Sequence, residues 1–309
     1  MSVDGEIEMI YQYYPPGAKK VIATGGSAFI GEVDEATVLK YPLAPDREVI
    51  RLEIERKLLE VIGPHPRIIG FKGFSDTGIY LERAVNGTLA HHLLESGLPP
   101  PSTRQRVSWC REAAEAVAHI HSRRVLHCDI QPTNLLLDDQ FHLKLADFQG
   151  RHLSEDGQVL LDGWSGEPCR FFCPRNDFFD ADIKTDLFAL GCNFHFIMMG
   201  HAVFPDIIDG EDGYREKVAA RFEKQEFPQD IHACSTVTLK CWKGLYGSAD
   251  ELVKEIQAVE QNLQDRGSLG LMDNLLYDHS SGLRWRTEDL KGTGLRNTHV
   301  RDVRVMQLV

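Results

Sequence analysis

The polar and apolar positions divide the chain into a strand-rich first part and a helical second part. Over residues 20–41, short β-type runs alternate with glycines and predict consecutive antiparallel strands. Residues 46–62 then repeat apolar positions at helical spacing, with Asp46 as a candidate N-cap. Two further strand-like runs cover residues 67–74 and 78–85. The pattern therefore predicts a small sheet that carries one helix.

Helical patterns dominate after residue 88. They cover residues 102–122, 186–200, 214–224 and 248–264. This order predicts an α+β protein whose two lobes meet near residues 82–87. The expected units are an N-terminal extension at 1–19, a β-rich N-lobe at 20–84, a helical C-lobe at 85–264, and a C-terminal tail of unknown structure at 265–309.

One stretch of the C-lobe carries side-chain oxygens at a spacing suited to chemistry. Asp129 is followed five residues later by Asn134, and Asp147 comes thirteen residues after that. Apolar runs on either side of a polar turn at 138–140 predict a hairpin that folds Asp147 back toward the other two. A phosphoryl-transfer site needs a carboxylate beside the attacking hydroxyl and oxygen ligands for Mg²⁺. The spacing favours such a site over the alternative, a hairpin with solvated carboxylates.

The N-lobe contains a glycine-rich pattern that fits a phosphate-binding loop. Small residues at Gly26, Ala28 and Gly31 would let backbone amides approach phosphates, and Val33 would cover the base. A purely structural turn fits the same residues, so the pattern alone does not decide between them.

Lys40 ends an apolar strand-like run and is a candidate phosphate ligand. A lysine at the end of a strand can instead extend to water. The helix that follows offers Glu55 as an ion-pair partner, with Glu53 as the competing choice. A buried Lys–Glu pair at this place could grip the α- and β-phosphates of a nucleotide.

The order of these motifs resembles the eukaryotic protein kinase family over roughly residues 20–262, in a divergent, fungal-type form. Downstream, TDLFALG looks like the buried sixth helix of the family, and LKCWKG looks like its late Cys-Trp element. The resemblance implies that the protein binds ATP and Mg²⁺. It also implies transfer of the γ-phosphate to Ser or Thr hydroxyls of protein substrates.

The resemblance assigns roles to single residues. Asp129 would be the catalytic base, Asn134 and Asp147 would bind Mg²⁺, and Lys40, oriented by Glu55, would hold the phosphates. The implied adenine site comprises Leu81 as gatekeeper, Glu82, Arg83 and Ala84 as the hinge, and Val33, Val38 and Leu136 around the ring. A spine behind the site would comprise Leu59, Phe71, His127 and Phe148, anchored by Asp186.

The chain also departs from the family at positions that bear on activity. Gln131 stands where Ser/Thr kinases usually have a lysine that contacts the γ-phosphate, and losing that cation would cost about 2–4 kcal/mol of transition-state stabilisation. Gln149 replaces the glycine after Asp147, so the flip of this loop is expected to be altered. Cys128 replaces an arginine that binds phosphate on the activation segment, so we expect no strict dependence on phosphorylation there. Arg175 replaces a glutamate, so the family's buried Glu–Arg ion pair is expected to be missing.

Two other functions remain open. The departures also fit a pseudokinase, a kinase-shaped scaffold or allosteric partner that binds nucleotide or nothing. A small-molecule kinase of the aminoglycoside or choline type uses a similar set of carboxylates and amide, although Pro174 and the Cys-Trp element argue against it.

The net charge and composition of the chain limit the kinds of molecule to which it is expected to bind. The formal net charge of −12 argues against non-specific nucleic-acid binding and against adsorption on an anionic membrane. Residues 187–204 are apolar, but Asn193, His195 and His201 interrupt them, which predicts a buried helix and not a membrane span. Seven cysteines without a regular framework, and an N-terminus without a long apolar stretch, predict free thiols in the cytoplasm or nucleus. The oligomeric state stays open.

Overall fold

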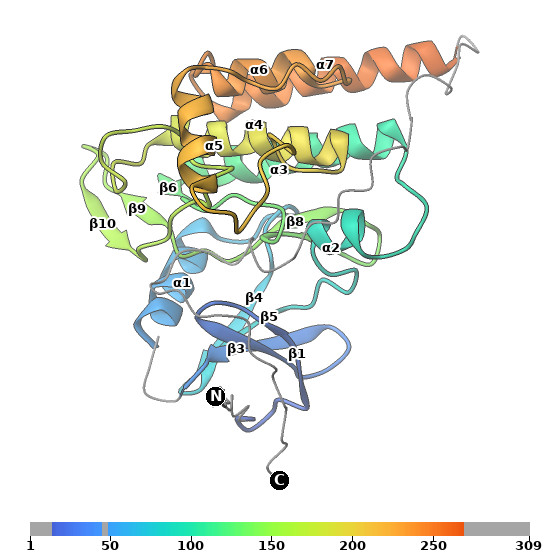
Figure 1. The fold of residues 1–309 in the computed structure, drawn as a ribbon. Helices are drawn as coiled ribbons and strands as arrows, with labels where there is room; N and C mark the ends of the chain where they lie inside the picture. The colour runs from blue at the N-terminus through green and yellow to red at the C-terminus, as the bar shows by residue number, and fades with distance from the viewer. Residues whose placement is uncertain (1–13, 45–48, 269–309) are drawn as a thin grey trace, which may run out of the picture.

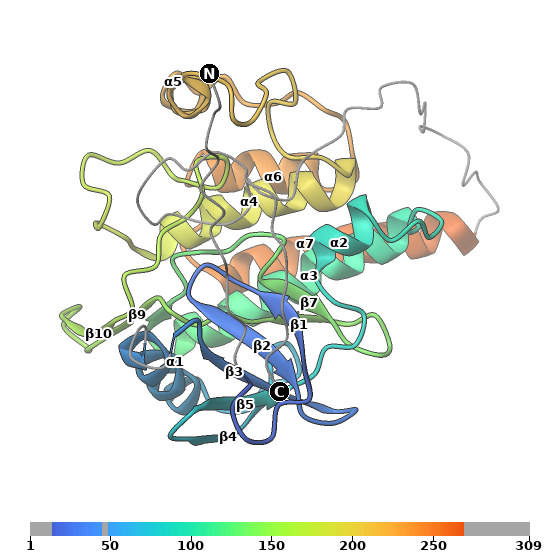
Figure 2. The same cartoon turned by 60° about the horizontal axis from the view of Figure 1, so that its bottom comes forward.

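The first lobe is a five-stranded antiparallel sheet with one helix. The structure is a computed structural model that describes residues 14–44 and 49–268. The strands are β1 (Lys20–Thr24), β2 (Ala28–Glu32), β3 (Thr37–Pro42), β4 (Phe71–Ser75) and β5 (Gly78–Glu82), in the order β1-β2-β3-β5-β4. Helix α1 (Val49–Ile62) packs on β3, β4 and β5, as Figures 1 and 2 show. The predicted cap Asp46 lies outside the described residues.

The second lobe is mainly helical, which confirms the predicted bilobal α+β fold. Its helices are α2 (Leu89–Leu94), α3 (Thr103–Ser122), α4 (Ile183–Met199), α5 (Tyr214–Glu223), α6 (Ser235–Trp242) and α7 (Ala249–Ser268). Two small sheets join β6 (Val125–Leu126), β9 (Arg151–Leu153) and β10 (Val159–Asp162), and β7 (Leu135–Leu137) with β8 (Leu143–Leu145). The short helix α6 and the β9–β10 hairpin were not predicted as elements.

Helix α4 runs through the middle of the second lobe. Its residues from Thr185 to Met198 are all buried, so the apolar stretch predicted as a buried helix is one as far as Met199, and residues 200–204 lie beyond its end. Asp182 and Thr185 form a capping box at its start, and Gly200 closes it in the left-handed conformation, at φ 78°. Among residues 14–44 and 49–268, no helix has both the length and the apolar character that crossing a membrane requires.

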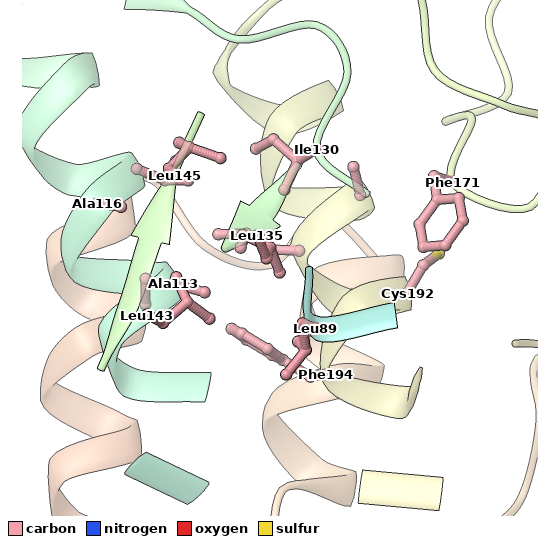
Figure 3. Close-up of a cluster of buried hydrophobic side chains, with 14 of the residues drawn as sticks. Leu89, Ala113, Ala116, Ile130, Leu135, Leu143, Leu145, Phe171, Cys192 and Phe194 are labelled. Carbon is pink, nitrogen blue, oxygen red and sulfur yellow. The ribbon is translucent and has the colours of Figure 1, made fainter. Parts of the chain in front are cut away.

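The β7–β8 hairpin rests on helices α3 and α4. Figure 3 shows Leu135 of β7 and Leu143 and Leu145 of β8 in one cluster with Ala113 of α3 and Phe194 of α4. All five side chains are at most 1% exposed. The small side chains of α3 let the hairpin lie close to the helix, and each buried leucine contributes about 1.5–3 kcal/mol. This packing fixes the two ends of the hairpin, where the candidate catalytic residues stand.

Candidate active site

Lys40 and Glu55 form a buried ion pair between the sheet and α1. Lys40 Nζ lies 2.5 Å from Glu55 Oε2, and the two side chains are 8% and 0% exposed. The competing Glu53 lies on the solvent side of α1, where it pairs with Lys57 at 3.0 Å. Lys40 therefore points inward, and Glu55 is its partner.

The same lysine contacts Asp147 from the second lobe. Lys40 Nζ lies 2.5 Å from Asp147 Oδ1. Burial raises the pKa of the Asp147 carboxyl, but the Lys40 ammonium outweighs that effect and holds the pKa below its ordinary value. Burial favours neutral Lys40, yet Asp147 and Glu55 together hold the pKa of its ammonium above the ordinary value. The pKa shifts of Asp147 and Lys40 therefore both favour the charged forms, whereas burial raises the pKa of the Glu55 carboxyl above its ordinary value despite the neighbouring Lys40 ammonium.

The loop between β6 and β7 brings Asp129, Asn134 and Gln131 together. Asn134 donates its side-chain amide to Asp129 Oδ2 at 3.0 Å and to the Asp129 carbonyl at 2.9 Å. Gln131 donates its amide to the other carboxylate oxygen at 2.7 Å. Burial, and then repulsion by Asp147, raise the pKa of the Asp129 carboxyl well above its ordinary value. Asp129 is thus fixed in position and is a stronger base than an exposed aspartate.

A buried aspartate on α4 fixes the start of this loop. Asp186 is 0% exposed and accepts the backbone N–H groups of His127 and Cys128, both at 2.9 Å. The His127 ring contacts the Phe148 ring edge-on, with centroids 5.2 Å apart, and burial lowers the pKa of this imidazole. Leu59 and Phe71 belong to the same apolar cluster. Of the residues expected to form a spine, His127 and Phe148 are thus in contact, Leu59 and Phe71 lie in the same large apolar cluster as Phe148, and His127 has a structural place beside it.

The sequence prediction for the phosphate loop is wrong at Gly31 and Val33. The β1–β2 turn lies at residues 25–27, and Gly31 falls inside β2 opposite Leu39. Because side chains alternate along a strand, Gly31 and Val33 face away from Lys40, which pairs with Ile30. Gly31 is needed for packing there, since a Cβ atom would lie 2.9 Å from Ala18 and 3.0 Å from Tyr41.

The other residues of the predicted phosphate loop and adenine site also divide between the two faces of the sheet. Val33 packs on the outer cluster of Phe29, Leu39 and Tyr41, so it does not cover a base on the Lys40 side. Gly26 lies in the turn, and Ala28 and Val38 are buried on the inner face. Of the predicted set, Ala28 and Val38 lie on the Lys40 face of the sheet, and Gly26 lies in the turn between β1 and β2.

The predicted hinge connects the two lobes behind this face. Leu81 is buried, and Leu136 is half-buried against the same core. Glu82 Oε2 accepts the backbone N–H of Gly70 at 3.0 Å and pairs with Lys144 of the second lobe at 3.0 Å. Arg83 donates its N–H to Ala36 O at 2.9 Å. Among the described residues the Ala84 N–H has no acceptor, which suits a hinge amide that binds a ligand.

Near Cys128, which stands where the family has an arginine, the segment after Asp147 carries an arginine of its own, Arg151. Cys128 is 3% exposed and carries no charge, since burial raises the pKa of its thiol. Arg151 Nε lies 3.0 Å from Asp162 Oδ2 within the same segment, and its guanidinium also donates to the Phe179 carbonyl. In the segment after Asp147, the Arg151 guanidinium is therefore already paired with a carboxylate of the same segment, Asp162.

Arg175, which stands where the family has a glutamate, forms a buried ion pair of its own. Its guanidinium lies 2.8 Å from Glu167 Oε2, and the side chains are 9% and 0% exposed. Its glutamate comes from the same segment, eight residues upstream, so this pair differs from the family's pair, which has its glutamate at position 175. Arg170 is likewise occupied, 2.6 Å from Asp209 Oδ1 and bonded to nearby carbonyls. Neither arginine replaces the cation that is missing at Gln131.

The donor set fits a magnesium ion that is shared with phosphates. Lys40 and Gln149 both donate to Asp147 Oδ1, so Oδ2 is the oxygen left to bind a metal, and Asn134 presents its amide oxygen. Within residues 14–44 and 49–268, no cluster of three His, Cys, Asp or Glu side chains could hold a metal ion alone. Mg²⁺ commonly binds one or two protein oxygens together with substrate phosphates and water. The residues present therefore fit that mode.

The chain belongs to the protein kinase family. The family model described as "Protein kinase domain" matches residues 39–269. Similar curated proteins include the serine/threonine-protein kinase kin-29 of Caenorhabditis elegans, 31% identical over 172 residues, which are 52% of this chain and 20% of that protein. The serine/threonine-protein kinase GIN4 of Saccharomyces cerevisiae is 27% identical over 216 residues, or 68% of this chain and 18% of that protein. Wall-associated receptor kinase-like 21 of Arabidopsis thaliana is 32% identical over 202 residues, which are 60% of this chain and 32% of that protein. The chain thus spans about a fifth to a third of the length of these relatives.

Sequence reasoning missed the contacts that the unusual residues make. It identified Gln131 and Gln149 as departures but assigned neither a partner. The structure shows that Gln131 holds Asp129 and that Gln149 reaches both Asp147 and Glu55. The buried positions of these glutamines could not be read from the linear pattern.

Proposed function

We propose that this protein kinase transfers the γ-phosphate of ATP, with Mg²⁺, to Ser or Thr hydroxyls of proteins. One observation carries the proposal: Lys40 of the first lobe is bonded to Glu55 and to Asp147 at once, each at 2.5 Å. A lysine so held is positioned for phosphates, and Asp147 is positioned for a metal that bridges them. The names of kin-29 and GIN4 support the choice of Ser/Thr over Tyr.

Each residue contributes positioning or proton transfer. Asp129, with its raised pKa, accepts the proton of the substrate hydroxyl. Asn134 and Asp147 would hold Mg²⁺, which neutralises phosphate charge when bound. Lys40 fixes the phosphates, and the hinge backbone at Ala84 fixes the base. Most of the rate enhancement then comes from orientation and fixed charge.

Nucleotide binding is tested first, by thermal unfolding with MgATP. At a hundredfold excess over Kd, binding stabilises the folded state by about 2.7 kcal/mol, or roughly 5–10 °C for a domain of this size. Lys40→Met, Asp147→Asn and Glu55→Gln should lose most of this shift. Glu53→Gln, two residues away on the exposed side of α1, is the matched control and should keep it. No shift in the wild type contradicts the proposal.

Phosphoryl transfer is tested separately with γ-labelled ATP and a mixture of protein substrates. Asp129→Asn should keep the thermal shift with MgATP and lose transfer by about a hundredfold or more, the scale of general-base catalysis. An unchanged rate in this variant would remove Asp129 from the mechanism.

A pseudokinase is the second candidate, and Gln131 is the observation that favours it. This neutral side chain is 3% exposed and already bonded to Asp129, so no cation stands beside the transferred phosphate at this position. A clear MgATP shift without transfer to any protein, unaffected by Asp129→Asn, would establish this second function.

A further inference from the structure

Gln149 joins the two lobes at the same atoms that Lys40 joins. Its amide nitrogen lies 3.1 Å from Asp147 Oδ1 and 3.4 Å from Glu55 Oε2. These are the two oxygens that bind Lys40 Nζ. Both partners are carboxylates, so only the NH₂ group of the glutamine can face them. An ammonium and an amide therefore bridge the same pair of carboxylates.

The backbone around Gln149 leaves its side chain little choice of direction. A Cβ atom on Gly150 would lie 2.0 Å from Leu126 O, and one on Gly163 would lie 2.2 Å from Gln149 O. The Gln149 carbonyl also accepts the N–H of Ser165 at 3.3 Å. The two glycines thus let three backbone segments pack closely on this residue. Its side chain is consequently 6% exposed and directed at α1.

The Gln149 amide is important because the Lys40 ammonium binds Glu55 and Asp147 and, in the proposed function, a phosphate as well. Glu55 is 0% exposed, and among the described residues its Oε1 has no hydrogen-bond partner, so Oε2 makes all its bonds. When a phosphate draws the Lys40 ammonium toward itself, the bonds from Lys40 to both carboxylates weaken. The carboxylates of Glu55, which is buried, and Asp147, which is partly exposed, would then repel each other. The Gln149 amide carries no charge that a phosphate attracts, so its bonds persist.

We propose that Gln149 is a positioning residue that ties α1 to the metal ligand Asp147. It holds Glu55, Lys40 and Asp147 in one arrangement and opposes movement of Asp147 and Phe148 out of the site. The idea rests on the proposed function for its purpose, but the link itself is a property of the folded protein. Glycine, which the family has here, cannot form it.

The link is tested by hydrogen exchange of the backbone amides, without nucleotide. The variants are Gln149→Met, which keeps length without donors, Gln149→Gly, and Gln149→Glu, which replaces the donor with a third carboxylate. Exchange in α1 should accelerate by roughly tenfold in the first two variants, the scale of hydrogen bonds to charged groups. It should accelerate further in Gln149→Glu, while exchange in α3 stays unchanged. The control Gln229→Met removes the part-buried hydrogen bond from the Gln229 amide to Phe227 O, in the loop between α5 and α6, and should match the wild type.

Kinetics give a second readout that general destabilisation would not produce. Because bound MgATP itself gathers these residues, Gln149→Met and Gln149→Gly should raise KM for ATP about five- to tenfold and change kcat by less than twofold. Exchange in α1 equal to the wild type in all three variants overturns the link, whatever the activity. Faster exchange without any transfer by the wild type supports the link and contradicts only the proposed function. Variants that do not fold under conditions where Gln229→Met folds would show that Gln149 serves packing, and would overturn the specific role.

Discussion

Replacing Gln131 with lysine places a cation beside Asp129, where the family usually has one. The amide nitrogen of Gln131 lies 2.7 Å from Asp129 Oδ1, so an ammonium at the end of a similar chain would lie next to both the base and the transferred phosphate. A positioned cation there is worth about 2–4 kcal/mol in the transition state, or roughly 30- to 900-fold in kcat.

Burial reduces that gain. Gln131 is 3% exposed, so the new lysine loses hydration and spends part of its charge on Asp129. We therefore expect kcat to rise by about 10- to 30-fold, less than the roughly 30- to 900-fold that a cation without this cost would give. The same cation lowers the pKa of Asp129, which burial and Asp147 raise in the wild type. Since the base must be ionised, kcat/KM falls as pH drops through this pKa, and Gln131→Lys should move that fall to lower pH.

The assay is steady-state transfer of labelled γ-phosphate to protein, over a pH series, with thermal unfolding in MgATP as a check of folding and binding. Gln131→Met has no cation and also loses the bond to Asp129, so its rate should fall below the wild type. A folded Gln131→Lys variant that binds MgATP but transfers phosphate no faster than the wild type would refute the reasoning. The glutamine would then not mark a missing cation.

Three further outcomes follow from ion pairs in the second lobe. Asp162→Asn should lower kcat several-fold by releasing Arg151, whereas phosphatase treatment of the wild type should leave kcat within twofold, measured in the same transfer assay. Asp186→Asn should cost about 3 kcal/mol in urea unfolding, because two buried backbone N–H groups lose a charged acceptor. Although burial raises the pKa of Asp186, its hydrogen-bond partners hold it below the ordinary value, so its contribution is complete above about pH 4 and is lost as pH falls through the folded-state pKa. Arg175→Glu should cost about 3 kcal/mol, and adding Glu167→Arg should recover part of it in a double-mutant cycle.

Residue spacing predicted most of the fold and the centre of the site. The apolar runs around the turn at 138–140 were enough to place Asp147 near Asp129, because a short turn forces the second strand to run back antiparallel to the first. Choosing Glu55 over Glu53 succeeded for a similar reason, since only one face of α1 can meet Lys40. Long, regular patterns with one apolar face leave few alternative arrangements.

Register was not predictable in the same way. The pattern of Gly26, Ala28, Gly31 and Val33 matches a phosphate loop when read as a line, but the turn lies at 25–27 and β2 begins at Ala28. A one-residue shift in the position of a strand relative to its turn places each of its side chains on the opposite face of the sheet. The composition of the run is unchanged by the shift, so the sequence pattern could not reveal it.

The residues that depart from the family have similar physical effects on the site. Cys128 and Gln131 remove cations, and Arg151 is neutralised by Asp162 of the same segment. Gln149 adds a neutral donor where the family has no side chain, and Arg175 pairs with Glu167 inside the segment. Cations that could bind an external phosphate are thus absent or already paired, and Gln131, Gln149, Arg151 and Arg175 all bond to other parts of this chain. Fixed bonds do not depend on phosphorylation of the segment, so such a site would be assembled by folding alone. Regulation would then have to act on substrate access, or on the chain outside the described residues, and not on the order of the segment that follows Asp147.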